Sequence, residues 1–205
     1  MKLYTSVGPN PLVVLTFMRE KGIEIPLQKI DLRGGENRQE DYLNNVNPMG
    51  QLPALELDDG SVLTEIVAIC EYLDEISDGP SLVGGTPEER AKTRMWIRRI
   101  DLNILEPLGD GFRSAEGLPM FKDRIYCMPD AADDFKKKAQ LNLTKIDGIM
   151  GDREYVVGDR FTLADIIFYC WLNFGIAVGQ PLNPDNKNIA AWFERMQNRF
   201  TADKK

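Results

Sequence analysis

The chain has 205 residues, of which 43% are hydrophobic and 28% charged, values typical of a globular protein with one or two domains. Its formal net charge of -7 argues against a nucleic-acid partner, because nucleic-acid-binding domains carry a basic surplus. The sequence contains no histidine, which excludes imidazole-based triads and the common imidazole metal sites. Catalysis, if the protein has it, must therefore use hydroxyls, amides, carboxylates, backbone N–H groups or a cofactor.

No stretch of the sequence is long and apolar enough to span a bilayer, and the N-terminus has no signal-peptide hydrophobic region. Cys70, Cys127 and Cys170 are odd in number and too few for a disulfide framework. They lie in apolar segments, where core packing is favoured over thiol chemistry. We therefore expect a cytoplasmic protein without a membrane anchor.

The first part of the chain alternates strand-like and helix-like segments. The helix over residues 12–21 is well defined, because Pro11 precedes it and Gly22 follows it. Asp59-Gly60 lies between two short apolar runs, which is a strong hairpin signal. In chain order we expect a strand at 2–4, a helix at 12–21, a strand at 25–32, a short helix at 36–46, hairpin strands at 54–57 and 61–63, and a helix at 65–76. This order is typical of a thioredoxin-like α/β domain with a mixed sheet.

Everything after Pro87 is predicted to be helical. Thr86 has the features of a helix start, and we expect its helix to continue through Leu108. Thr162 and Asp165 have capping-box spacing before a helix that is apolar nearly all round and should be central. Further helices are expected at 122–128, 130–150 and 188–199. The predicted organisation is a thioredoxin-like domain at 1–80, a linker at 81–86 and an all-α helical-bundle domain at 87–205.

One segment carries most of the functional information: Asn47-Pro48-Met49-Gly50-Gln51-Leu52-Pro53, followed by Asp58-Asp59-Gly60 and then Glu65-Ile66-Val67-Ala68-Ile69. It closely resembles the glutathione transferase family, whose thioredoxin-like domains carry Asn-Pro-x-Gly-x-x-Pro, a hairpin and then Glu-Ser-x-Ala-Ile. The run from Gly158 to Asp165 resembles the family's C-terminal capping motif. The resemblance covers essentially the whole chain and implies the glutathione transferase fold, glutathione as co-substrate and a homodimer.

The resemblance implies how the motif would hold glutathione. Pro53 would be a cis-proline that exposes the N–H and C=O of Leu52 for pairing with the cysteinyl unit. Glu65 would receive the α-ammonium of the γ-glutamyl group, and the N–H groups at Ile66 and the next residue would hold its carboxylate. Gln51 can add an amide contact.

The sequence departs from the family pattern at Ile66, because the family has serine there. One hydroxyl donor to the γ-glutamyl carboxylate is therefore missing, and we expect weaker or altered glutathione affinity. Arg38, or its neighbours Asn37 and Gln39, is the candidate for binding the glycyl carboxylate.

Glutathione attacks as a thiolate, so the protein must lower the pKa of the bound thiol. The opening frame is similar to that of the bacterial beta class, which has a cysteine where Asn10 stands, so a beta-class mixed disulfide is not available. Asn10 is similar to the asparagine in the Pro-Asn of nu-class enzymes, and its N–H can donate to a thiolate at a helix N-terminus. Thr5 and Ser6 are hydroxyl alternatives, whereas Tyr4 is expected in the core.

The second substrate is expected to be a small hydrophobic electrophile or a disulfide that binds against the C-terminal helices. An apolar helix face is first of all core, so the residues proposed to line this pocket have that alternative reading. Asp101 and Asn103 are candidates for reaching the glutathione of a partner subunit. The pocket candidates are Ile104, Pro107, Leu108, Phe112 and Phe174.

The expected activity is glutathione transfer in detoxification, with disulfide-reductase or peroxidase activity as variants of the same chemistry. Two alternatives stay open at this point. One is a glutathione-dependent isomerase or dehalogenase using the same thiol site. The other is a non-catalytic glutathione-binding or regulatory protein.

Overall fold

The computed structural model describes residues 1–202. The chain divides into two compact units, the first spanning Met1–Gly85 and the second beginning at Thr86. Each unit is described by itself.

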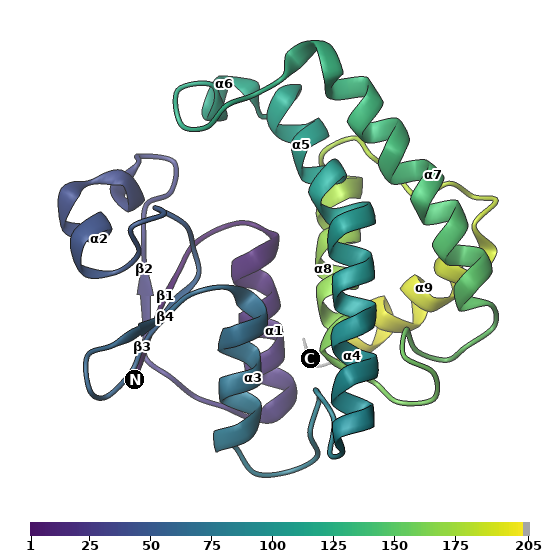
Figure 1. Cartoon of the computed structure of the whole chain (residues 1–205), viewed down its shortest axis with the longest axis horizontal. Coiled ribbons are helices and arrows are strands. Elements are labelled where there is room, and N and C mark those ends of the chain that lie inside the picture. Colours follow the sequence, from purple (N-terminus) through teal and green to yellow (C-terminus); the bar gives the residue numbers. More distant parts are fainter. Residues whose placement is uncertain (203–205) are drawn as a thin grey trace. The chain divides into compact units, whose positions relative to one another are not determined.

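The first unit is a four-stranded mixed sheet with helices on both faces, as expected for a thioredoxin-like domain. The strand order is β2-β1-β3-β4, with β1 parallel to β2 and antiparallel to β3, and β3 antiparallel to β4. Helices α1 and α3 pack side by side on one face, and α2 lies on the other (Figure 1). The elements are β1 (Lys2–Thr5), α1 (Pro9–Lys21), β2 (Leu27–Lys29), the 3-10 turn η1 (Glu36–Arg38), α2 (Glu40–Asn45), β3 (Ala54–Glu56), β4 (Val62–Leu63) and α3 (Ile66–Ile76).

Three elements of this unit differ clearly from the sequence prediction. The strand expected at 25–32 covers only Leu27–Lys29. Helix α1 begins at Pro9 rather than at residue 12, because a proline is favourable in the first helical turn, where its missing N–H is not needed. The expected helix at 36–46 is two elements, since Gln39 has extended backbone angles of φ -76° and ψ 152°. The hairpin at Asp59-Gly60 and the helix end at Gly22 are confirmed.

A buried ion pair fastens the end of the first unit. The Lys21 ammonium lies 3.2 Å from the Asp74 carboxylate, and both side chains are almost fully buried. Lys21 also donates to the Pro80 carbonyl at 3.0 Å. The same carboxylate accepts the Ser81 hydroxyl and the Leu82 N–H. A buried charge needs such partners, and here they hold the segment after α3 on the first unit.

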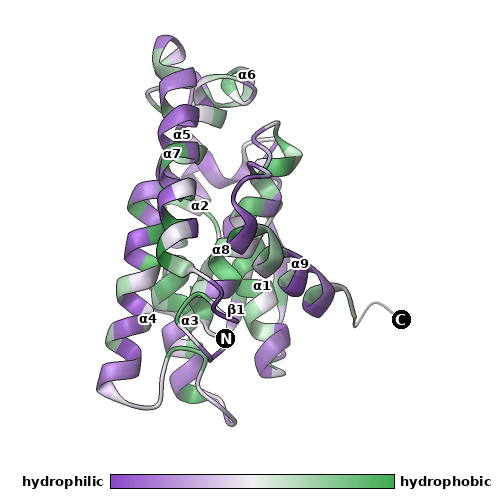
Figure 2. Cartoon of the chain, turned by 90° about the vertical axis from the view of Figure 1, so that its right-hand side faces the viewer, coloured by the Kyte–Doolittle hydropathy of each residue, from purple (hydrophilic) through white to green (hydrophobic). Residues whose placement is uncertain are grey.

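The second unit is entirely helical in the part of the chain that the structure describes. Capping boxes at Thr86–Glu89 and Thr162–Asp165 start two of its helices, as expected. The first ten residues of α8 are all buried, and Figure 2 colours this helix largely hydrophobic. The elements are α4 (Pro87–Ile100), the π-helical turn η2 (Asp101–Leu105), α5 (Glu106–Ser114), α6 (Leu118–Phe121), the 3-10 turn η3 (Pro129–Ala131), α7 (Ala132–Met150), α8 (Leu163–Ala177) and α9 (Lys187–Thr201).

The helix predicted at 122–128 is wrong. A short helix, α6, lies earlier, and residues 122–128 form turns and irregular backbone. Most side chains of this segment are exposed, and that of Tyr126 is 88% exposed. Helices in proteins are stabilised mainly by burying an apolar face, and this segment buries none.

A π-helical turn interrupts the helix that we expected to run unbroken to Leu108. Pro107 has no N–H, so the carbonyl of Asn103, four residues earlier, receives no helical hydrogen bond from it. The side chain of Asn142 on α7 supplies the missing donor, with its Nδ2 2.8 Å from that carbonyl. The Glu106 N–H bonds instead to Asp101, five residues back. The π turn therefore combines a proline in the chain with a donor from a neighbouring helix.

Substituting Asn142→Ala tests this account. It removes the donor to the half-buried Asn103 carbonyl, so we expect the free energy of unfolding to fall by about 1 kcal/mol relative to a matched control. The control is Asn173→Ala on α8, an exposed asparagine whose side chain has no hydrogen bond among residues 1–202. Both variants gain the same helix propensity. Equal stabilities in urea denaturation would show that Asn142 does not support the π turn.

Candidate functional site

Three strand ends bring the predicted glutathione-binding residues to one edge of the first unit's sheet. Tyr4 of β1 pairs with Ala54 of β3, so continuing this antiparallel register by two residues places Ser6 opposite Leu52. On the other side of β3, Leu55 pairs with Leu63. Continuing that register by two residues places Glu65 opposite Pro53. The start of β3 therefore lies between the turn after β1 and the start of α3.

The Leu52–Pro53 peptide bond is cis, as the resemblance implied. Leu52 and Pro53 are both buried, whereas Gln51 is exposed. Among the residues that the structure describes, the N–H and C=O of Leu52 take part in no hydrogen bond. Both groups are thus available to a ligand that pairs with this segment as an added strand.

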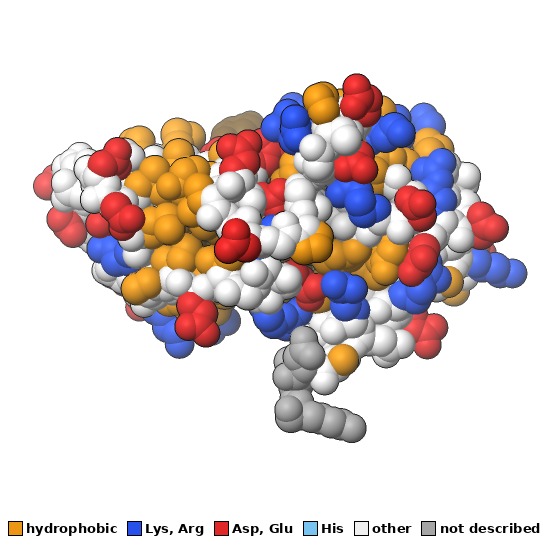
Figure 3. All heavy atoms as spheres, turned by 90° about the horizontal axis from the view of Figure 1, so that it is seen from below, with side chains coloured by type: hydrophobic (Ala, Val, Ile, Leu, Met, Phe, Trp, Pro, Cys, Tyr) orange, Lys and Arg blue, Asp and Glu red, His pale blue; other side chains and the backbone are white. Residues whose placement is uncertain are grey.

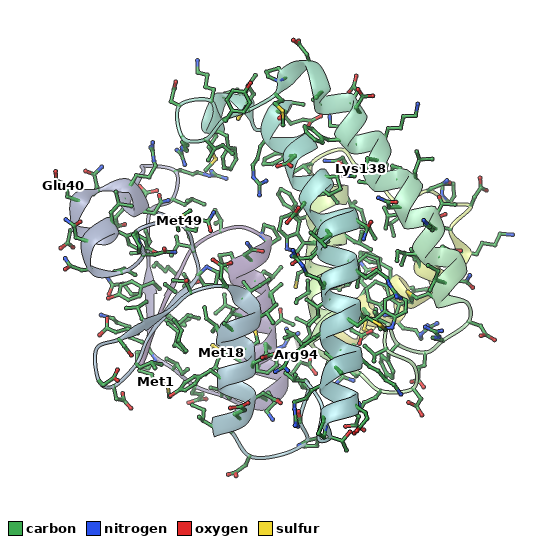
Figure 4. All side chains as sticks on the ribbon, viewed as in Figure 1. Met1, Met18, Glu40, Met49, Arg94 and Lys138 are labelled. Atoms are coloured by element: carbon green, nitrogen blue, oxygen red, sulfur yellow. The ribbon has the colours of Figure 1, made fainter. Side chains whose placement is uncertain are left out.

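The turn before Leu52 is built around Asn47, which is 2% exposed. Its carbonyl accepts the Gly50 N–H at 2.8 Å, and its side-chain oxygen accepts the Met49 N–H at 2.9 Å. Gly50 has a φ of +63°, and an added Cβ would lie 3.1 Å from the Asn37 carbonyl oxygen, so glycine suits this position. Met49 lies between α2 and β3 and is exposed (Figure 4). Asn47 therefore organises the turn while its neighbours face solvent.

Two buried donors meet at the Gln51 carbonyl, and sequence reasoning gave neither of them a role. The Tyr42 hydroxyl donates to it at 2.8 Å, and the Asn47 amide donates at 3.1 Å. A third side chain, Asn37, donates to the Gly50 carbonyl. Asn47 belongs to the recognised motif, which was a signal in the sequence. Nothing in the sequence indicated that the Tyr42 hydroxyl would reach the backbone nine residues later.

Glu65 has a φ of 67° and a ψ of 122°, and it is the one non-glycine residue with positive φ among residues 1–202. Such backbone angles cost an ordinary residue of order 1–3 kcal/mol and cluster at functional sites. Its side chain is exposed and makes no capping hydrogen bond to α3. The N–H groups of the first turn of α3, which begins at the half-buried Ile66, are therefore not covered by that carboxylate.

The turn after β1 holds the three candidates for thiol activation. Asn10 is the second residue of α1 and is partly exposed near that helix's N-terminus. The Ser6 hydroxyl donates to the Ile30 carbonyl at 2.7 Å. Thr5 is 3% exposed, and its hydroxyl has no partner among the described residues. Asn10 is thus the one of the three that lies on a helix, and it is partly exposed.

Tyr4 lies in the apolar cluster on the α2 side of the sheet, as expected for a core residue. Its hydroxyl donates to the Glu56 carboxylate at 2.6 Å. Burial raises the pKa of the Tyr4 hydroxyl, and its hydrogen bond to Glu56 acts in the same direction. The Tyr4 hydroxyl therefore stays protonated, and its hydrogen is donated to a residue of β3.

Arg38 ends the 3-10 turn η1 and is exposed. Its guanidinium lies against Gly35, where an added Cβ would approach Nη2 to 2.5 Å. Gly35 also has a φ of +82°. A side chain at position 35 would displace the guanidinium, so the glycine leaves room for Arg38 beside the 47–51 turn that Asn37 contacts.

In the second unit the five electrophile-pocket candidates separate into two groups. Ile104, Pro107 and Leu108 are buried, and Leu108 packs against Gly175 of α8, where an added Cβ would lie 2.9 Å from it. Phe112 and Phe174 are partly exposed, and their rings meet edge to face at 5.0 Å. The two phenylalanines therefore offer more accessible apolar surface than the three core residues.

Asp101 and Asn103, the cross-subunit candidates, lie in the π turn. Both are half-buried. The Asn103 amide donates to the Arg99 carbonyl at 2.7 Å, so its side chain already has a partner within the helix. Asp101 lies 3.8 Å from the Arg98 guanidinium.

No helix within 1–202 is long and apolar enough to cross a membrane. No group of three or more acidic or cysteine side chains in that range could hold a metal ion. On the face drawn in Figure 3, basic and acidic side chains are interspersed.

Comparison with known proteins agrees with this geometry. Residues 7–76 match the N-terminal domain of glutathione S-transferases, and residues 118–199 match the C-terminal domain. The chain is 32% identical over 202 residues to Glutathione S-transferase 2 of Saccharomyces cerevisiae, covering 98% of this chain and 86% of that one. It is 30% identical over 185 residues to Maleylacetoacetate isomerase of Pseudomonas aeruginosa, covering 87% and 84%.

A solved structure gives the same result for the fold. The crystal structure of a glutathione S-transferase domain-containing protein from Marinobacter aquaeolei VT8 matches with a TM-score of 0.90 at 35% identity, covering 97% of this chain and 98% of that one. The sheet order, the unpaired backbone groups of Leu52 and the position of Glu65 are thus found in a chain similar to these proteins over nearly its full length. This chain belongs to the glutathione S-transferase family.

Proposed function

We propose that the protein binds glutathione at the edge of the first unit's sheet and presents its thiolate to a small hydrophobic electrophile or a disulfide. The observation that carries this proposal is the convergence of three features at that edge: the unpaired Leu52 backbone, the strained Glu65 at the start of α3, and the Asn10 turn. Each part of the chain then has one role: residues 1–80 bind glutathione, residues 81–86 link the domains, and residues 87–205 supply the electrophile pocket.

The charged groups at each end of glutathione have a protein group of opposite charge or a hydrogen-bond donor to pair with. The γ-glutamyl ammonium pairs with the exposed Glu65 carboxylate, and its carboxylate accepts N–H groups at the start of α3. The Gln51 amide adds a contact, and the exposed Arg38 receives the glycyl carboxylate. Ile66 adds no hydroxyl where the family has serine, so the backbone alone holds the γ-glutamyl carboxylate.

Asn10 is our choice for stabilising the thiolate. An amide N–H in front of a helix N-terminus donates to the sulfur without proton transfer. Ser6 is a less favourable candidate because its hydroxyl already donates to the Ile30 carbonyl. Thr5 is less favourable because it is buried. The turn thus has a beta-like frame, with a nu-like Pro-Asn in place of the cysteine.

Several reactions share this thiol site. Conjugation to an electrophile, reduction of a disulfide and reduction of a hydroperoxide all begin with the bound thiolate. Glutathione-dependent isomerisation is the second candidate, favoured by the 30% identity to Maleylacetoacetate isomerase. Assays with a chloroaromatic acceptor, a small disulfide, a hydroperoxide and a cis-unsaturated diketo acid separate these reactions.

We also propose that the protein works as a cytoplasmic homodimer in detoxification. The segment from Glu65 to Asp78, which contains α3, has three acidic residues besides the ligand candidate Glu65 and the buried Asp74, and it has no basic one. Helix α4 has five basic residues and no acidic one between Arg90 and Arg99, and Figure 2 colours it largely hydrophilic. In a two-fold dimer that places α3 against the partner's α4, acidic side chains of one helix face basic side chains of the other. The symmetry repeats this contact, so the dimer contains it twice. Asp101, next to Arg98, would then lie near the partner's glutathione.

The variant Glu65→Ala tests glutathione recognition. Because it removes the partner of the ammonium, we expect the glutathione Kd to rise about 10- to 100-fold, as for loss of a charged hydrogen bond. Retention on immobilised glutathione should be lost. Glu24→Ala, an exposed acid outside α3 and outside the 47–53 segment, should behave as wild type. An intact protein that does not bind glutathione, or a Glu65→Ala variant with wild-type affinity, would contradict the proposed site.

The variant Asn10→Ala tests thiol activation. Losing a hydrogen bond to a thiolate should raise the pKa of bound glutathione by about 1–2 units, which a titration of thiolate absorbance measures. The rate at neutral pH should fall about tenfold, since less thiolate is present. Asn44→Ala on α2, an exposed asparagine, serves as the control. A full rate and an unchanged thiol pKa in Asn10→Ala would show that another group activates the sulfur.

A further inference from the structure

We infer that Tyr42 is a positioning residue for glutathione: with Asn47 it fixes the Gln51 carbonyl, and thereby points the Leu52 N–H at the cysteinyl unit of the bound tripeptide. This inference rests on the proposed function, since it requires that the cysteinyl unit pairs with Leu52. It adds a residue outside the family motif to the machinery that aligns the thiol.

The peptide group between Gln51 and Leu52 sets the direction of the Leu52 N–H. The bond between Gln51 and Leu52 is trans, because Leu52–Pro53 is the one cis bond among residues 1–202. In a planar trans peptide the C=O and the N–H point in opposite directions. The Gln51 carbonyl points to the Tyr42 hydroxyl and the Asn47 amide, at 2.8 and 3.1 Å. The Leu52 N–H therefore points away from these buried donors, where it has no partner within the described chain.

Two donors at one carbonyl restrain that peptide against rotation. A carbonyl oxygen has two lone pairs, and here both are used. Rotating the peptide would break both hydrogen bonds and leave the Tyr42 hydroxyl and the Asn47 amide buried without an acceptor. Both side chains are at least 96% buried, with 4% and 2% of their surface exposed. An unpaired buried donor is costly, so the outward direction of the Leu52 N–H is maintained before any ligand binds.

Within the part of the chain that the structure describes, the Tyr42 hydroxyl makes one hydrogen bond, to the Gln51 carbonyl. Its ring packs in the apolar cluster on the α2 side of the sheet and meets the Tyr4 ring edge to face, with centroids 6.2 Å apart. Burial raises the pKa of Tyr42, so it remains a proton donor at neutral pH. A phenylalanine would keep the ring packing and lose only the donor, which separates positioning from core packing.

The test is a comparison of two ligands on the full-length protein. One is glutathione, and the other is a glutathione analogue whose cysteinyl carbonyl is replaced by a methylene group, so that it cannot accept the Leu52 N–H. In Tyr42→Phe we expect the Kd for glutathione to rise about three- to tenfold, corresponding to one weakened hydrogen bond. The Kd for the analogue should stay at its wild-type value. The kcat at saturating glutathione should change less than KM.

Tyr4→Phe is the matched control, because it removes a phenolic hydroxyl from the same cluster whose partner is Glu56 rather than the 47–51 turn. It should leave both Kd values unchanged, and thermal unfolding should show that both variants fold. Wild-type affinity for glutathione in Tyr42→Phe, or an equal loss for both ligands, would overturn the inference. A wild-type protein that does not bind glutathione would instead overturn the proposed function, before any variant is compared.

Discussion

The carbonyl of Gln51 accepts hydrogen bonds from two buried donors, and the geometry of the glutathione-facing edge depends on that contact. It joins α2, through Tyr42, to the turn at Asn47. It also sets the direction of the next peptide N–H, immediately before the buried Pro53. Without it, the register of β3 would still bring Leu52 beside the turn after β1, but the Leu52 N–H would be free to rotate away from a ligand.

The rest of the site is positioned by the sheet and by one strained residue. Antiparallel pairing of β3 with both β1 and β4 gathers Ser6, Leu52 and Glu65 at the same edge. The positive φ of Glu65 turns the chain from β4 into α3 and leaves the first N–H groups of that helix without a side-chain cap. The strained backbone angles are therefore compatible with a ligand taking the place of the cap.

Local patterns predicted much of this fold. Asp59-Gly60 predicted the hairpin, and the Thr162–Asp165 spacing predicted a capping box, because both signals act between neighbouring residues. Contacts between distant elements were not predictable. The π turn needs Asn142 from α7, and the Gln51 carbonyl needs a hydroxyl from α2. Residues 122–128 failed as a helix because helical propensity without a buried face is insufficient.

In the candidate site, too, features of a short motif were predictable and contacts between distant elements were not. The resemblance predicted the cis bond at Pro53, which the structure shows, and it singled out Leu52 and Glu65 as binding candidates, since these follow from a short motif. It gave no indication that Ser6 would donate to Ile30. For Ile104 and Leu108 the sequence left both a pocket and a core role open, and the structure shows both side chains buried. Such outcomes depend on which side of each element is covered, and short spacings in the sequence do not specify that.

Amide hydrogen exchange at residues 49–52 tests the central claim most directly, namely that the Leu52 N–H is directed outward and unpaired until glutathione binds. The Met49 and Gly50 amides, which are bonded to Asn47, should be protected with and without glutathione. The Leu52 amide should exchange rapidly in the free protein and become protected when glutathione is added. A Leu52 amide that is protected in the free protein, or that glutathione leaves unprotected, would contradict this account.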